Sequence, residues 1–142
     1  MQTFLLVPLF VVACELIRRG GTLAFDVWGV PLLALGVVQF RLVGQFRTAH
    51  GGGGPGIDNP PTRIVTEGPY ALTRNPMYLA HLIFMLGLAV TLHSWVAVAV
   101  LVLRAIWFHR RVVADEARLA ERFGAEYVDY ARRVKRWVPH IG

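Results

Sequence analysis

Long apolar runs separated by short polar breaks dominate the first three quarters of the chain. Residues 3–17 are apolar except for Glu15, and residues 23–46 contain only four polar or charged side chains. Residues 75–103 contain no Asp, Glu, Lys or Arg at all. Continuous apolar stretches of this length are typical of transmembrane helices rather than of the half-apolar helices of soluble proteins.

The third apolar run is too long for a single crossing. As one helix it would measure about 44 Å, whereas the hydrocarbon core of a bilayer is about 30 Å thick. We therefore expect a hairpin, with one helix over 76–92, a turn near His93, and a second helix from Trp95 to about Phe108. With the two earlier runs, this makes about four membrane helices.

The remaining segments are polar and differ in kind. Residues 47–75 contain a Gly- and Pro-rich stretch, which indicates a loop. Residues 109–142 carry charges of both signs, with apolar positions spaced three or four apart as in an amphipathic helix, at Val113, Ala117, Ala120, Phe123, Tyr127 and Tyr130. Gly124 is expected to separate two helices in this tail.

The pattern therefore predicts an all-α protein: a multi-pass bundle of about four transmembrane helices with a cytosolic C-terminal helical cap. It forms one domain over 1–142, divided into two membrane helices (1–46), a cytosolic loop (47–75), a membrane hairpin (76–108) and C-terminal cytosolic helices (109–142). An alternative for the first segment is a signal peptide, but it lacks a basic n-region and three further apolar runs follow.

Composition agrees with a membrane protein. Of 142 residues, 55% are apolar and 17% are charged, with a mean hydropathy of +0.48, against about 25% charged in soluble domains. The net charge of +6 comes from arginines gathered on the side of the loop and tail, which places both in the cytoplasm. Acidic residues interleave with them, so nucleic-acid binding is not expected. Arginine outnumbers lysine fourteen to one, which favours a bacterial source and its cytoplasmic membrane.

Glu15 supports a rival function. An acidic residue within a membrane helix invites a functional interpretation, and a small four-helix proton-coupled multidrug transporter would need one. Arg18, three residues further along a helix, offers a simpler explanation as an ion-pair partner. A non-catalytic membrane anchor is a third class. Neither class needs the glycine-rich loop and charged tail.

Two polar stretches suggest chemistry. The first leads into the third apolar helix, with a tight turn at Gly68-Pro69 and a helix start at Asn75-Pro76. Free amides at a helix start, with Arg74 beside them, suit a carboxylate or another anion. The alternative is an ordinary loop-to-helix junction with interfacial tyrosines.

The second stretch begins at Asp115-Glu116 and runs to Val134. Taken alone, it fits the charged face of a helix lying on the membrane surface. Its position changes this interpretation, because both stretches lie on the cytoplasmic side at the membrane edge. Together they could enclose a polar ligand.

The ordered set Gly68-Pro-Tyr, Arg74-Asn-Pro-Met-Tyr78, Asp115-Glu116 and residues 123–134 resembles the isoprenylcysteine carboxyl methyltransferase family and related phospholipid methyltransferases. The resemblance covers roughly 66–139. It implies an integral membrane methyltransferase that uses S-adenosylmethionine, with S-adenosylhomocysteine as product, and acts on a lipid-like or prenylated acceptor at the membrane–cytosol interface. Membrane lipids are the implied partners, and the oligomeric state stays open.

The resemblance also implies site residues. The cofactor-binding positions are Gly68, Pro69, Tyr70, Arg74, Asn75, Pro76, Tyr78, Leu79, Glu116, Tyr127 and Tyr130. We expect Glu116 to pair with the amine or ribose of the donor. Either Arg133, from the C-terminal signature, or Arg104, near the membrane edge, would orient an acidic acceptor, although Arg104 could equally snorkel to the interface.

One departure leaves the acceptor open. The carboxyl methyltransferases usually have His where this chain has Asn75, and Asn-Pro-Met-Tyr is instead similar to phospholipid amine methyltransferases. A prenylated carboxylate, a phospholipid amine, a small thiol and a lipid hydroxyl all remain as acceptors. No histidine pair has metal-ligand spacing with a carboxylate, so no metal site is predicted.

Overall fold

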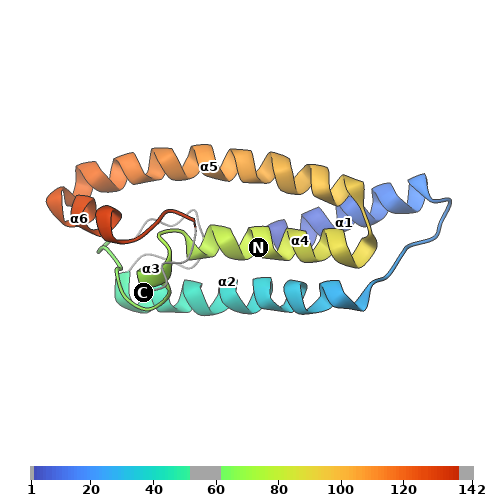
Figure 1. Cartoon of the computed structure of the whole chain (residues 1–142), viewed down its shortest axis with the longest axis horizontal. Coiled ribbons are helices and arrows are strands. Elements are labelled where there is room, and N and C mark those ends of the chain that lie inside the picture. Colours follow the sequence, from blue (N-terminus) through green and yellow to red (C-terminus); the bar gives the residue numbers. More distant parts are fainter. Residues whose placement is uncertain (1, 52–61, 138–142) are drawn as a thin grey trace. The chain divides into compact units, whose positions relative to one another are not determined.

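The computed structural model describes residues 2–51 and 62–137, and within them all regular structure is helical (Figure 1). The elements are α1 (Gln2–Arg18), the 3-10 turn η1 (Val27–Gly29), α2 (Val30–Gly51), α3 (Pro69–Leu72), α4 (Pro76–Leu92), α5 (Trp95–Phe123) and α6 (Ala125–Arg133). The predicted all-α class is therefore confirmed.

The chain divides into two compact units. The first comprises Met1–Val38 and Ala80–Ile106, and the second comprises Gln39–Leu79 and Trp107–Gly142. The divisions fall inside α2, α4 and α5. Each unit is described by itself below.

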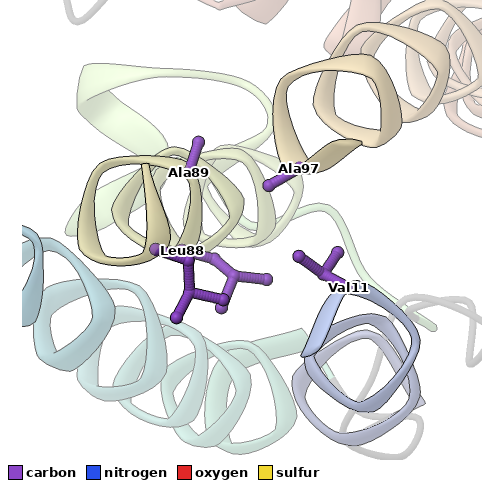
Figure 2. Packing of buried hydrophobic residues seen from close by; sticks show 5 residues of the cluster. Val11, Leu88, Ala89 and Ala97 are labelled. Atoms are coloured by element: carbon purple, nitrogen blue, oxygen red, sulfur yellow. The ribbon is translucent and has the colours of Figure 1, made fainter. Parts of the chain in front are cut away.

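The core of the first unit joins α1, α4 and α5. Figure 2 shows Val11 of α1, Leu88 of α4 and Ala97 of α5 directed into a shared space between the helices. Val11 is completely buried, and Ala97 is nearly so. The small Ala97 side chain lets the first turn of α5 approach the other two helices.

Glycines bring α2 and α4 close together in this unit. A Cβ atom on Gly36 would lie 2.7 Å from the Cβ of Phe84, and one on Gly87 would lie 2.7 Å from the backbone nitrogen of Leu33. Real Cβ atoms do not approach so closely. Both positions therefore need glycine because the neighbouring helix occupies the space of a side chain.

A buried carboxylate joins α1 to the turn between α4 and α5. Ser94 Oγ donates to Glu15 Oε1 at 2.6 Å, while Arg18 Nη2 and Arg19 Nε lie 2.9 and 2.8 Å from Oε2. Arg19 also donates to the carbonyl of His93 at 2.7 Å. The expected pair of Glu15 with Arg18 is present, and these contacts satisfy a charge that would be costly to bury alone.

The hairpin turn falls where the sequence predicts it, but the second helix does not end there. α4 ends at Leu92 and α5 begins at Trp95. The expectation that this helix stops near Phe108 is wrong, because α5 continues without interruption to Phe123. No Gly or Pro occurs between Trp95 and Phe123, so nothing local breaks the helix. Gly124, with φ of +61°, separates α5 from α6 as expected.

One helical stretch in the described part of the chain, Val27–Gly51, is both long and apolar enough to cross a membrane, and 22% of its most apolar window is buried. A core helix of a soluble protein would be mostly buried, so this helix exposes its apolar face. α4 is apolar but has only 17 residues. Other helices also expose large apolar side chains, including Leu5, Leu9 and Ile17 on α1 and Leu103 on α5.

Candidate functional site

A pocket in the second unit collects residues from both polar stretches. It lies among the end of α2, the loop before α3, the start of α4, the middle of α5, and α6. Its lining residues are Arg47, Ile64, Val65, Tyr70, Arg74, Asn75, Asp115, Glu116, Leu119, Tyr127 and Tyr130. Apolar walls with a few charged groups are typical of a small-molecule site.

Glu116 lies on α5 with its side chain 12% exposed, and two guanidinium groups hold it. Arg136 donates to both carboxylate oxygens, with Nε 3.2 Å from Oε1 and Nη2 2.8 Å from Oε2. Arg74 Nη1 lies 3.3 Å from Oε1. The hydrogen bond with Glu116 raises the pKa of Arg136. The carboxylate is thus kept in one orientation at the pocket wall.

Three tyrosines form the apolar side of the pocket. Tyr127 and Tyr130 are buried in one cluster with Val134, and Tyr70 packs against it. Burial raises the pKa of Tyr70 to about 12, which the charge of Arg47 partly opposes, and burial also raises the pKa of Tyr130. Both phenols are therefore neutral at neutral pH.

The hydroxyls of Tyr130 and Tyr127 differ in their partners. Tyr130 donates to the carbonyl oxygen of Tyr70 at 2.7 Å. The Tyr127 hydroxyl is also buried, but it makes no hydrogen bond of good geometry with any described residue. Arg74 is close enough to oppose the rise in its pKa, which burial chiefly causes. A buried hydroxyl without a good partner is a position that a polar ligand group can satisfy.

Asp115, next to Glu116, is engaged by other side chains. The Tyr78 hydroxyl donates to Asp115 Oδ2 at 3.2 Å. Arg118 Nη1 lies 3.6 Å from Oδ1, and Arg111 Nε lies 3.9 Å from Oδ2. Both carboxylates that line the pocket therefore face positively charged partners.

The segment after α6 pairs with the residues that precede α4. The backbone nitrogen of Arg74 donates to the Lys135 carbonyl at 3.0 Å. Thr73 Oγ1 and Asn75 Nδ2 donate to the Arg136 carbonyl at 2.9 and 3.1 Å. α4 begins at Pro76 as predicted. The amide nitrogen of the Asn75 side chain thus binds this segment.

Gly68 has a structural reason to be glycine. Its φ is +58°, and a Cβ atom there would lie 2.6 Å from the ring of Phe46. The turn that the sequence predicts is followed by the short helix α3, which begins at Pro69 and places Tyr70 in the pocket wall.

Six of the predicted cofactor-binding residues line the pocket together: Tyr70, Arg74, Asn75, Glu116, Tyr127 and Tyr130. The other five are not among the lining residues: Gly68 lies in the turn, Pro69 begins α3, and Pro76, Tyr78 and Leu79 lie in the first turn of α4.

The two arginines expected to orient an acceptor are not in the pocket wall. Arg133 has a side chain that is 63% exposed and pairs with Asp129 at 3.2 Å, one turn earlier on α6. Arg104 lies on the part of α5 that belongs to the first unit. The structure therefore does not bring Arg133 to the pocket, because α6 turns this side chain towards solvent.

Sequence reasoning missed several residues at this site. They are Arg47, Ile64, Val65, Asp115 and Leu119 in the lining, and Arg136 behind Glu116. Arg47 counted only as an orientation signal, although a charged residue at the end of an apolar helix could have marked it. Arg136 lies in an arginine-rich stretch where nothing local distinguishes it from its neighbours.

Comparisons with known proteins show what the chain is similar to. The sequence model of the family described as phospholipid methyltransferase matches residues 25–126. Over 82 residues the chain is 40% identical to Protein-S-isoprenylcysteine O-methyltransferase B of Arabidopsis thaliana, which covers 56% of this chain and 41% of that protein. Over 78 residues it is 35% identical to the cobalt-zinc-cadmium resistance protein CzcN of Cupriavidus metallidurans, covering 55% and 36%.

A third relative is the Protein-S-isoprenylcysteine O-methyltransferase of Mus musculus, which is 35% identical over 80 residues, or 55% of this chain and 28% of that protein. The chain thus spans less than half of the length of these relatives. No solved structure gives a significant match.

Proposed function

Because the chain belongs to the phospholipid methyltransferase family, we propose that it is an S-adenosylmethionine-dependent methyltransferase acting on a lipid-like acceptor at the membrane–cytosol interface. The observation that carries this proposal is the pocket around Glu116. It combines a fixed carboxylate, arginines, and a buried tyrosine hydroxyl without a good partner. These groups come from both motifs of the resemblance.

The groups in the pocket suit the donor. S-adenosylmethionine carries an ammonium, a carboxylate and ribose hydroxyls, so its site needs both signs of charge. Glu116 would hold the ammonium or the ribose, the Arg74 guanidinium would hold the carboxylate, and the Tyr127 hydroxyl would bond a remaining polar atom. The backbone amides of Arg74 and Asn75 are already bonded to the Lys135 carbonyl and to Thr73 Oγ1. When bound, the donor would supply a methyl group on a sulfonium: the nucleophile bonds to the methyl carbon while the carbon–sulfur bond breaks, and the neutral thioether leaves without acid catalysis.

The chain's own task is then mainly alignment. Residues held in fixed orientations keep two reactants in the reacting geometry, and this can lower a barrier by several kcal/mol. The tyrosine cluster excludes water from one side of the pocket, and the paired arginines keep Glu116 from rotating. No lining residue needs to carry a proton.

The charges favour an acceptor that bears a carboxylate, such as a prenylated cysteine. A carboxylate is already a nucleophile, whereas an ammonium must first lose a proton to a base. Among the described lining residues the candidate bases are Asp115 and Glu116, and both face arginines. Arg47, buried in the same wall, adds a further positive charge to the pocket.

A phospholipid amine is the second candidate acceptor. The family description favours it, and so does Asn75 at a position where the carboxyl methyltransferases usually have His. Transfer to an amine would then require that the amine reach the pocket already deprotonated.

The protein is also proposed to span a bacterial cytoplasmic membrane with α1, α2, α4 and the first half of α5. Support comes from the apolar stretch Val27–Gly51 and from exposed apolar side chains on other helices. The loop 47–75 and the C-terminus would lie in the cytosol, where the donor is available. The transporter alternative loses its main argument, because Ser94, Arg18 and Arg19 all engage Glu15.

Donor binding tests the proposal most directly. Calorimetry on detergent-solubilised protein should detect S-adenosylhomocysteine binding to the wild type, and Glu116→Gln should weaken it at least about tenfold, since a charge-assisted contact is lost. The exposed Glu121 on the same helix provides the control Glu121→Gln, which should bind as the wild type does. No binding to the wild type would refute the function.

The acceptor class is decided by the product. Methyl label from S-adenosylmethionine should enter a farnesylcysteine analogue as an ester that releases methanol in alkali. Label in phosphatidylethanolamine, stable to alkali at the methyl group, would instead support the amine acceptor and overturn the carboxylate assignment.

A further inference from the structure

Arg136 contacts both halves of the candidate site although it lies outside the helices. Its guanidinium binds Glu116 on α5 through Nε and Nη2. Its backbone carbonyl accepts from Thr73 Oγ1 and from Asn75 Nδ2, directly before α4. The two motifs of the site are 41 positions apart in sequence, from Asn75 to Glu116, and this residue connects them.

We propose that Arg136 is a positioning residue that sets the orientation of the Glu116 carboxylate for the methyl donor. The proposal rests on the proposed function, because it assumes that Glu116 binds the donor. Arg136 is not itself among the lining residues, and its side chain is about one-third exposed and bound to Glu116, which does line the pocket. It therefore acts through Glu116 rather than on the ligand.

The geometry explains why an arginine is needed. A glutamate side chain has three rotatable torsions, and fixing it costs conformational entropy at the moment of binding. A planar guanidinium that donates to both carboxylate oxygens fixes the plane of the carboxylate beforehand. Arg74 approaches the same carboxylate through Oε1 at 3.3 Å and cannot impose this orientation with a single longer contact.

The effect of the Arg136 side chain on Glu116 can be tested separately from the pairing of this segment with the start of α4, because that pairing uses main-chain carbonyls. Thr73 and Asn75 bind the carbonyl oxygen of Arg136, and the Arg74 amide binds that of Lys135. A side-chain substitution at position 136 leaves these carbonyls in place. It therefore removes the link to Glu116 while the segment can stay paired with the start of α4.

The test measures S-adenosylhomocysteine affinity for full-length Arg136→Gln and Arg136→Lys in detergent. We expect Arg136→Gln to bind S-adenosylhomocysteine about tenfold more weakly than the wild type does. Arg136→Lys should bind with an affinity between the two, because lysine keeps the positive charge but cannot donate to both carboxylate oxygens in the geometry of a guanidinium. In turnover assays the KM for the donor should rise more than kcat falls. The control is Arg132→Gln, an exposed arginine on α6 that should bind like the wild type.

A double-mutant cycle distinguishes positioning from a purely structural role. If Arg136 acts through Glu116, then Arg136→Gln should have little further effect on affinity in the Glu116→Gln background. Equal losses in both backgrounds would overturn the proposal, and so would unchanged affinity of Arg136→Gln. If Arg136→Gln does not fold, the same cycle is run with Arg136→Lys. Absence of donor binding to the wild type would instead refute the proposed function.

Discussion

Two tyrosines of one cluster differ in whether the hydroxyl group has a hydrogen-bond acceptor, and we expect this difference to give them different roles. Tyr127 and Tyr130 are three positions apart on α6 and equally buried. The Tyr130 hydroxyl has a backbone acceptor at 2.7 Å, and the Tyr127 hydroxyl has no partner of good geometry in the described structure. The first therefore stabilises the fold, while the second is available to a ligand.

Replacing each tyrosine with phenylalanine should separate these roles. Tyr130→Phe loses a good hydrogen bond and should reduce the free energy of unfolding by about 1 kcal/mol. Tyr127→Phe should leave stability unchanged or slightly higher, because it removes a buried hydroxyl that is poorly satisfied, yet it should weaken donor binding severalfold. Thermal unfolding and calorimetry in the same detergent measure both effects. A loss of stability in Tyr127→Phe with unchanged affinity would contradict this assignment.

At the level of elements, glycine allows α2 and α4 to pack closely. Gly36 faces Phe84 with no room for a methyl group, whereas a Cβ atom on Gly44, two turns further along α2, would meet Met77 Cε at an ordinary 3.7 Å. Both glycines lie within the same helix. Close approach is therefore required at one position of α2 and not at the other.

This difference predicts opposite effects of the same substitution. Gly36→Ala should destabilise the protein by about 1–3 kcal/mol, because the added methyl overpacks against Phe84. Gly44→Ala should be neutral or stabilising by up to about 1 kcal/mol, since alanine favours a helix more than glycine does. Unfolding temperatures in detergent compare the two variants. Equal destabilisation by both would show that the close contact at Gly36 is not the cause.

For the whole molecule, the arrangement of charge along the chain bears on topology. Arg18 and Arg19 are engaged by Glu15 beside the α4–α5 turn, while the second unit carries all the remaining arginines except Arg104. In the topology that we propose, the positive-inside rule would place the pocket in the cytosol. It would place the segment between α1 and α2 on the opposite side.

Cysteine labelling tests this topology. The native Cys14 is replaced by serine, and single cysteines are introduced at two exposed sites by Thr22→Cys and Arg132→Cys. A membrane-impermeant maleimide should label Thr22→Cys in intact spheroplasts, and Arg132→Cys only after permeabilisation. Labelling of both from the same side would exclude an odd number of crossings between the two positions, and with it the proposed four-helix arrangement.

Much of this protein is determined by local sequence. Apolar runs predict the helices, because the apolar side chains of a run favour burial or lipid contact wherever the run lies in the fold. The family is also recognisable in the motifs, and the comparisons confirm this resemblance. The turn at His93 and the helix start at Pro76 follow from residues within a few positions. The change from apolar to polar residues at Phe108, by contrast, does not end the helix, because α5 continues to Phe123.

Tertiary structure alone decided which charged residues meet when they lie far apart in the sequence. Arg133 and Arg136 are both basic residues of one short segment, yet one faces solvent and pairs with Asp129, and the other binds Glu116. The difference arises because α6 ends at Arg133 and the chain then turns to pair with the start of α4. Sequence spacing cannot reveal such a pairing, since it depends on contacts made by backbone carbonyls about sixty residues away.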